Sequence, residues 1–142
     1  ASYRRQRQMC IRDRPNINAA LGVAELENIN KKLSLKKKLF NRYRNYFLNI
    51  PEINILENNL SDSISNNWLI TLKIEFSDLK ETIEFKNKLL NIAHKKGILL
   101  RPVWKPSHTL SIYKNNPQGD LKVTNDIYNR LINLPSSPHL FR

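Results

Sequence analysis

The segment 68–76 places the strongest constraint on how this chain can fold. Its apolar residues recur at every second position, namely Trp68, Ile70, Leu72, Ile74 and Phe76. Threonine, lysine and glutamate fill positions 71, 73 and 75 between them. A period of two is typical of a β-strand whose two faces meet different surroundings. The segment therefore predicts a strand.

A helix and a second strand are expected directly after it. Ser77 is a candidate N-cap for a helix that runs to about Lys96, and Gly97 stands where a left-handed C-terminal cap is needed. We expect the core face of this helix at Thr82, Phe85, Leu89, Ile92 and Ala93. Residues 98–103 predict a short second strand, so the three elements form one β-α-β unit.

The residues before this unit predict a helical lead-in at 15–50. Pro15 suits the start of a helix that carries two apolar stripes, which is typical of a helix buried between two bodies. Ser34 is a candidate cap for a second helix, which Pro51 ends. Residues 51–67 are polar and rich in asparagine and serine, and are expected to form a loop.

The residues after the unit predict a third helix and another short strand. Asp120 can cap the helix, and the strand is expected at 131–134, before Pro135. The predicted fold class is α+β: residues 51–142 form a small strand-helix-strand-helix domain whose sheet is covered by two helices.

The net charge of +12 raises nucleic acid or an anionic membrane surface as partners. Arginine clusters at 4–7 and lysine at 36–38. No RNA-binding aromatic motif or helix-turn-helix spacing accompanies them. A small basic nucleic-acid-binding module is therefore the alternative function. The simpler interpretation is a solvated lysine face, with Lys36, Lys37 and Lys38 on the exposed side of the second helix.

Residues 1–14 differ in composition from everything that follows, because they contain neither lysine nor asparagine. The string RRQRQMCIRD within them resembles a translated sequencing-adapter tail. We expect a non-native tail that adds nothing to the fold, and a basic arm for nucleic acid is the functional alternative.

Cysteine content and hydropathy point to a cytoplasmic protein. The single cysteine, Cys10, excludes an internal disulfide and suits a reducing compartment. No apolar run approaches the roughly 20 residues that cross a bilayer, so no membrane partner is expected.

The motifs of a self-contained active site are missing. The three glycines, Gly22, Gly97 and Gly119, belong to no phosphate-binding loop. The cysteine and the three histidines lack metal-ligand spacing, and no nucleophile stands in a catalytic pattern. If the chain is enzymatic, it is expected to be part of an enzyme.

Two motifs carry a resemblance to a known family. Residues 15–27 read PNINAALGVAELE, residues 97–104 read GILLRPVW, and residues 133–138 read NLPSSP. The first resembles the segment MPNxNAALGxAQLE that follows the cofactor-lysine region in sugar aminotransferases of the DegT/StrS type. The second, together with the 133–138 stretch, resembles the closing segment of the LegC-like subgroup, which makes amino sugars for bacterial surface glycans.

The resemblance implies a pyridoxal-phosphate-dependent enzyme of fold type I. It would move an amino group from an amino acid, glutamate, to a keto-sugar nucleotide, and it would work as a homodimer. The large α/β domain, with the Schiff-base lysine and most cofactor contacts, would lie upstream of this chain. No catalytic residue is then expected here, and the chain alone is not expected to hold the cofactor or to transaminate.

The resemblance also implies candidate binding residues. Arg101 would contact a substrate anion, Trp104 would stack on a sugar or a base, and His108 would line the same pocket. Asn16 would lie near the cofactor across the dimer. An asparagine and an arginine that reach the cofactor phosphate in the family align with Ile11 and Asp13, which cannot donate to a dianion.

Overall fold

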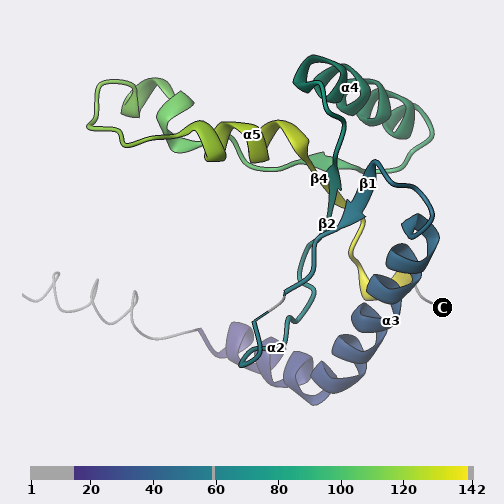
Figure 1. The fold of residues 1–142 in the computed structure, drawn as a ribbon. Helices are drawn as coiled ribbons and strands as arrows, with labels where there is room; N and C mark the ends of the chain where they lie inside the picture. Colours follow the sequence, from purple (N-terminus) through teal and green to yellow (C-terminus); the bar gives the residue numbers. More distant parts are fainter. Residues whose placement is uncertain (1–14, 59, 141–142) are drawn as a thin grey trace, which may run out of the picture.

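The structure of the chain is a computed structural model that describes residues 15–58 and 60–140. It is an α+β fold, as predicted, in which helices pack against a four-stranded sheet (Figure 1). The expectations for residues 1–14, including the alignment of Ile11 and Asp13, lie outside the described residues.

The strand order of the sheet is β1-β2-β4-β3, and every neighbouring pair is antiparallel. The strands are β1 (Ile53–Ile55), β2 (Ile70–Ile74), β3 (Arg101–Pro102) and β4 (Leu131–Leu134). β2 is the strand predicted from the alternation, and its burial alternates as expected. The prediction of a loop throughout 51–67 was wrong at β1, which pairs with β2 from Ile53 opposite Ile74.

The β-α-β unit is confirmed as β2, α4 and β3, but its two strands are not neighbours. β4 lies between them and pairs with both. Because β2 and β3 are each antiparallel to β4, they are parallel to one another. The last strand in the sequence therefore lies inside the sheet.

Helix α4 (Leu79–Lys95) is delimited as its sequence indicates, with the cap one residue later than predicted. The Asp78 carboxylate, rather than Ser77, accepts from the backbone N–H of Lys80 at 3.0 Å. Gly97 takes a φ of 73°, and the N–H of Ile98 donates to the carbonyl of Ala93, which closes the helix as expected for a C-terminal glycine.

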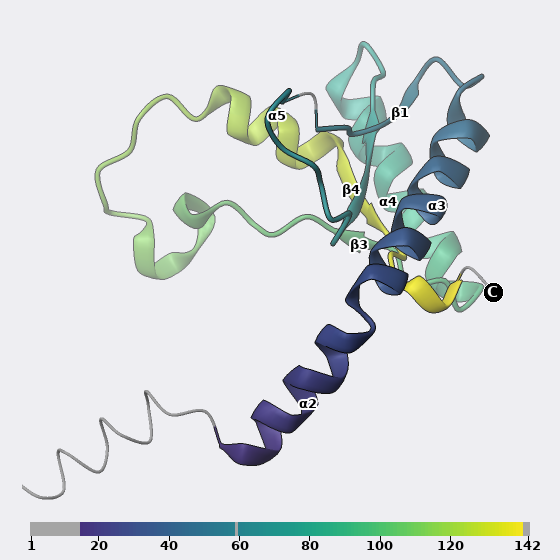
Figure 2. The same cartoon turned by 90° about the horizontal axis from the view of Figure 1, so that it is seen from below.

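The lead-in consists of α2 (Asn16–Glu27) and α3 (Ile29–Phe47), separated only at Asn28. The cap predicted at Ser34 was wrong, because Ser34 lies inside α3. Figure 2 shows α2 running on from α3 and away from the sheet. No residue of α2 is buried, and its apolar side chains Ile17, Leu21 and Leu26 are 64–79% exposed.

Helix α5 (Lys122–Arg130) leads directly into β4. The cap predicted at Asp120 was wrong by one residue, because Leu121 is the N-cap of α5, although the Asp120 carboxylate accepts from the backbone N–H of Lys122 at 3.0 Å. Between β3 and α5 the chain forms a long arm with two 3-10 turns, Ser107–Thr109 and Ser111–Tyr113 (Figure 1). A third 3-10 turn, Pro138–Leu140, follows β4 and packs on α3.

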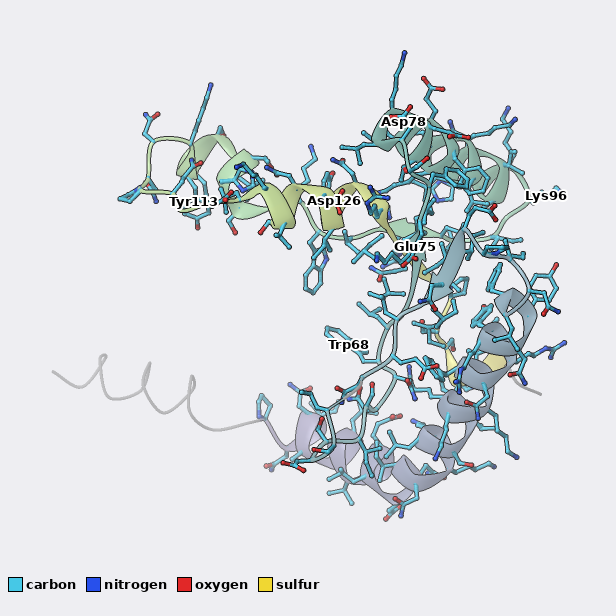
Figure 3. All side chains as sticks on the ribbon, viewed as in Figure 1. Trp68, Glu75, Asp78, Lys96, Tyr113 and Asp126 are labelled. Atoms are coloured by element: carbon cyan, nitrogen blue, oxygen red, sulfur yellow. The ribbon has the colours of Figure 1, made fainter. Side chains whose placement is uncertain are left out.

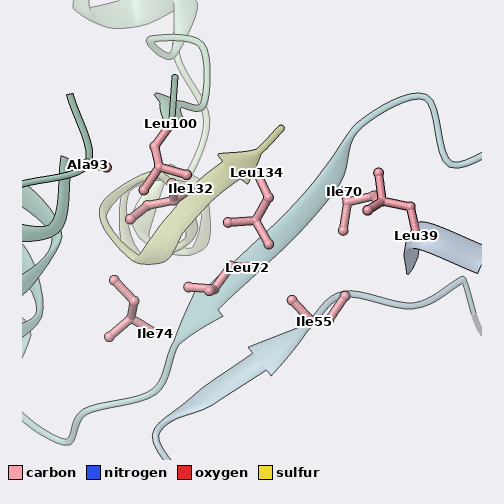
Figure 4. Packing of buried hydrophobic residues seen from close by; sticks show 9 residues of the cluster. All are labelled: Leu39, Ile55, Ile70, Leu72, Ile74, Ala93, Leu100, Ile132 and Leu134. Atoms are coloured by element: carbon pink, nitrogen blue, oxygen red, sulfur yellow. The ribbon is translucent and has the colours of Figure 1, made fainter. Parts of the chain in front are cut away.

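The core lies between the sheet and helices α3 and α4 (Figure 4). Its buried residues are Leu39, Ile55, Ile70, Leu72, Ile74, Ala93, Leu100, Ile132 and Leu134. Of the predicted α4 face, Thr82 and Ala93 are buried, whereas Ile92 is 43% exposed, so its assignment was wrong. Lys86 is buried instead, with its ammonium donating to the Tyr128 carbonyl at 2.6 Å.

No helix in the described part of the chain is long and apolar enough to cross a membrane.

Candidate functional site

Two of the three predicted binding residues line one hollow at the β3 edge of the sheet. This Arg101 hollow has a volume of about 560 Å³, and its walls include Lys36, Trp68, Arg101, Trp104, Asn133 and Ser136. These residues come from α3, from the entry to β2, from β3 and the segment after it, and from β4 and its exit. The hollow thus joins segments that are far apart in the sequence.

A row of polar residues crosses the sheet into this hollow. Thr71 on β2 lies opposite Asn133 on β4, which lies opposite Arg101 on β3. The Thr71 hydroxyl donates to Asn133 Oδ1 at 2.9 Å, which turns the amide nitrogen of Asn133 away from Thr71. Among the described residues, neither that nitrogen nor the Arg101 guanidinium has a hydrogen-bond or ion-pair partner. Two unpaired donor groups therefore stand on adjacent strands.

Both tryptophans of the chain stand at the same hollow. The rings of Trp68 and Trp104 meet edge to face, with their centroids 6.4 Å apart. They are 64% and 81% exposed, although large aromatic residues usually bury most of their surface. Figure 3 shows the Trp68 side chain projecting from the entry to β2. The hollow thus offers aromatic surface beside its donors.

The exit of β4 is fixed to the entry of β2 by Ser136. Its hydroxyl accepts from the backbone N–H of Ile70 at 2.8 Å and donates to the carbonyl of Leu134 at 2.8 Å. Ser136 was noted in the sequence only as part of a family-like stretch. Its hydroxyl replaces one rung of the ladder at the end of the sheet.

The lysine run of α3 is not uniformly exposed, which corrects the expectation for Lys36. Its Nζ donates to the carbonyls of Asn67 and Trp68 at 3.2 Å each and of Ser136 at 2.7 Å. Burial lowers the pKa of Lys36 from its ordinary value. Lys37 and Lys38 are exposed, as expected.

His108 lines a different hollow from Arg101. This second hollow, of about 750 Å³, lies under the long arm, and its walls include Trp104, His108, Tyr113 and Thr124. His108 is half-buried in the first 3-10 turn. Trp104 lines both hollows, so the three predicted binding residues are linked through it rather than gathered in one place.

Asn16 is exposed as the first residue of α2 and lines neither hollow. His94 is exposed near the end of α4, and its Nε2 lies 2.7 Å from the carbonyl of Leu100, so it joins α4 to the segment before β3.

Lys36 and Asn133, which line the Arg101 hollow, were not predicted as site residues. Lys36 precedes Leu39, Phe40 and Tyr43 by three, four and seven residues, which is the spacing of one helix face. That spacing indicates that Lys36 faces the core side of α3, but the run of three lysines had been interpreted as one exposed surface. Asn133 had no such signal, because its position opposite Arg101 depends on a strand pairing that no local pattern specifies.

The fold and the hollow define a small α+β domain with an open face that carries donors and aromatic rings. The sequence matches the DegT/DnrJ/EryC1/StrS aminotransferase family over residues 14–142, and the chain belongs to this family. The resemblance noted in the sequence is thereby confirmed at the level of the family.

Similar proteins include a GDP-perosamine synthase from Escherichia coli O157:H7, which is 31% identical over 125 residues. That match covers 88% of this chain and 32% of the relative. Among solved structures, PseC of Helicobacter pylori, an aminotransferase of pseudoaminic acid biosynthesis, superposes with a TM-score of 0.75 at 25% identity. The superposition covers 87% of this chain and 32% of PseC. The PLP form of Spr1654 from Streptococcus pneumoniae gives a TM-score of 0.72 at 25% identity, over 88% and 31%.

The chain thus spans about a third of the length of the relatives it matches. The family is pyridoxal-phosphate-dependent, and the ammonium groups of two described lysines are already bonded within this domain. The two lysines with a lowered pKa, Lys36 and Lys86, both donate to backbone carbonyls.

Proposed function

We propose that this chain forms the substrate-side small domain of a pyridoxal-phosphate-dependent sugar-nucleotide aminotransferase. The enzyme would transfer an amino group from glutamate to a keto-sugar nucleotide used for surface glycans. The observation that carries the proposal is the family match over residues 14–142, which places the Arg101 hollow in a chain related to enzymes named for sugar nucleotides.

The Arg101 hollow has the chemistry to bind the anionic part of such a substrate. A guanidinium binds phosphate oxygens through two parallel N–H donors. The amide nitrogen of Asn133, on the neighbouring strand, adds a third donor that carries no charge. The rings of Trp68 and Trp104 offer flat surface for a sugar or a base. His108, in the second hollow, would reach the substrate from the far side of Trp104.

The exposed helix α2 indicates where the rest of the enzyme would pack. Its apolar side chains are exposed on more than one face, which suits a helix enclosed by a large domain and by a second subunit. In the homodimer, Asn16 at the start of α2 would approach the partner's cofactor. Pyridoxal phosphate, held by the large domain, would carry the amino group, while this chain would bind and orient the substrate.

The same proposal places the enzyme in the cytoplasm, without a nucleic-acid or membrane partner. The alternative, a basic nucleic-acid-binding module, relied on the arginine cluster at 4–7, which lies outside the described residues, and on the lysine run at 36–38. All three donors of Lys36 are used by backbone carbonyls, so this lysine is not available to a phosphate backbone.

A chimaera tests the proposal. Residues 15–142 would replace the matching third of the E. coli GDP-perosamine synthase, and steady-state amino transfer would be measured. Arg101→Ala should lower kcat/KM by about 10- to 100-fold, as expected for the loss of one charge-assisted contact of about 1.5–3 kcal/mol. The double variant Lys37→Gln/Lys38→Gln removes two positive charges from an exposed surface and should keep activity close to that of the parent chimaera.

The opposite ranking of the two variants would refute the proposal and return the function to the basic surface. A separate measurement concerns the cofactor. The chain of 142 residues, mixed with pyridoxal phosphate, should give no stable protein-bound aldimine absorbance band. Such a band, mapped to one lysine, would contradict the division of roles between the two domains.

A further inference from the structure

We infer that Lys36 is a positioning residue of the Arg101 hollow, because its ammonium holds the two segments that carry Trp68 and Ser136 against helix α3. The effect on substrate binding rests on the proposed function. The effect on the shape of the hollow does not, and can be measured without any ligand.

The Lys36 ammonium makes three contacts with backbone carbonyls. An ammonium group has three N–H donors and no acceptor. Those of Lys36 meet the carbonyls of Asn67, Trp68 and Ser136. The acceptors belong to two segments separated by more than sixty residues, the entry to β2 and the exit of β4. One side chain therefore fixes two neighbouring strand ends, which lie at the same end of the sheet, to α3.

The turn at the entry to β2 is bonded on both sides. Asn67 has a φ of 50°, a conformation that residues other than glycine adopt at a cost. The side chains of Ser65 and Asn66 accept from the N–H groups of Asn67 and Trp68. The Lys36 ammonium takes the carbonyls of the same two residues, so both sides of this turn are bonded. Trp68 is thereby set in place although its ring is mostly exposed.

A second side chain of α3 binds the exit of β4 beside Lys36. Tyr43, seven residues later and on the same helix face, donates its hydroxyl to the carbonyl of Pro135 at 3.1 Å. Lys36 and Tyr43 thus bind consecutive carbonyls at the exit of β4. Among the described residues, no carboxylate is paired with Lys36, so its charge is satisfied by peptide dipoles alone. Replacing Lys36 with a residue that has no side-chain donor would leave these three partly buried carbonyls without that hydrogen bond.

Trp68 then transmits this position to the site. Its ring meets that of Trp104, which stands three residues after Arg101. Loss of the Lys36 contacts releases Trp68 and opens the aromatic wall of the hollow. Arg101 lies on β3, paired with Asn133 of β4. The donors of Lys36 are used by the three carbonyls, so Lys36 acts on the site through Trp68 and not as an anion contact.

The test compares Lys36→Met with the matched variants Lys37→Met and Lys38→Met. All three remove one charge from one turn of α3, but only Lys36 has the carbonyl contacts. The folded chain without ligand is measured by near-ultraviolet circular dichroism, in which coupling between the only two tryptophans gives a band. Trp104→Phe identifies that band. It should fall strongly in Lys36→Met and stay unchanged in the two controls.

An unchanged band in a folded Lys36→Met chain would overturn the inference. If this variant does not fold, Lys36→Arg decides. A guanidinium can donate to these carbonyls, so the band should be retained in Lys36→Arg in large part. A Lys36→Arg band as weak as that of Trp104→Phe would overturn the inference, because the donors would then not be what holds Trp68.

Binding of GDP, followed by quenching of tryptophan fluorescence, separates this inference from the proposed function. We expect Lys36→Met to raise the Kd for GDP by about tenfold, because Trp68 would no longer be held in position. Lys37→Met should leave this Kd unchanged. Failure of the wild-type chain to bind GDP would count against the nucleotide assignment and leave the ligand-free result standing. Equal binding by Lys36→Met and Lys37→Met would limit Lys36 to a role outside the site.

Discussion

Replacing Arg130 with methionine should destabilise the chain by about 2–3 kcal/mol. The Arg130 guanidinium joins α5 to the end of β2: it donates to the carbonyl of Phe76 at 2.9 Å and, more weakly, to that of Ile74 at 3.4 Å. It also pairs with both oxygens of Asp126 at 2.8 and 2.9 Å. A hydrogen bond from a charged donor contributes about 1.5–3 kcal/mol. The partly exposed i,i+4 pair with Asp126 adds only about 0.3–0.5 kcal/mol.

The two parts of this sum can be separated by substitution. The Asp126 side chain is 47% exposed, so water can hydrogen-bond to its carboxylate if the ion pair is lost. The Arg130 side chain is only 16% exposed, so water cannot as easily replace its hydrogen bond to the carbonyl of Phe76. Methionine keeps an apolar stem in place of the arginine stem. Asp126→Asn should therefore cost less than about 1 kcal/mol, because Arg130 keeps its carbonyl contacts.

Urea unfolding at 25 °C, followed by far-ultraviolet circular dichroism, measures both variants and the double variant. With an unfolding entropy of about 0.3 kcal/mol/K for a chain of this length, Arg130→Met should also lower Tm by roughly 8 °C. The reasoning fails if Arg130→Met costs no more than Asp126→Asn. In that case the ion pair, and not the contact with β2, would be what Arg130 contributes.

Two further predictions concern the core and a buried charge. Ile132→Ala should lower the free energy of unfolding in urea by about 2–5 kcal/mol, because Ile132 is fully buried on the inner strand β4. Ile98 is 47% exposed, so Ile98→Ala should lower it far less, and equal losses would contradict the assignment of the core. Burial lowers the pKa of Lys86 from 10.5, so between the lowered pKa and 10.5 the unfolded chain binds more protons than the folded chain. The stability of the wild type relative to Lys86→Met should therefore rise with pH in that window, and this gain should be lost as pH falls through the folded pKa. A stability difference that stays flat or falls between pH 8 and pH 10.5 would contradict this linkage.

Local patterns were sufficient to predict most elements of this fold. The alternation at 68–76 specifies β2, because a half-buried strand needs an apolar residue at every second position. Gly97 marks the end of α4, because few other residues adopt a φ of 73° without strain. Such signals depend only on neighbouring residues.

Features that depend on pairing between distant segments were not predictable in this way. β1 contributes only Ile53 and Ile55 as apolar residues in a polar stretch, and it becomes a strand because β2 lies beside it. In the site, Arg101 and Trp104 were found through the family resemblance. The Asn133 donor and the Lys36 contacts arise from strand register and from the packing of α3, which a single sequence does not specify.

The position of β4 determines when the domain can form during synthesis. The strand that joins β2 to β3 is made last, and the Thr71–Asn133 contact spans 62 residues. At roughly 5–20 residues per second, a ribosome needs several seconds to pass from β2 to β4. Throughout that time β2 has an open edge of backbone donors and acceptors, and β3 has no partner strand. Closure of the sheet, and assembly of the Arg101 hollow with it, is therefore delayed until residues 131–136 have left the ribosome.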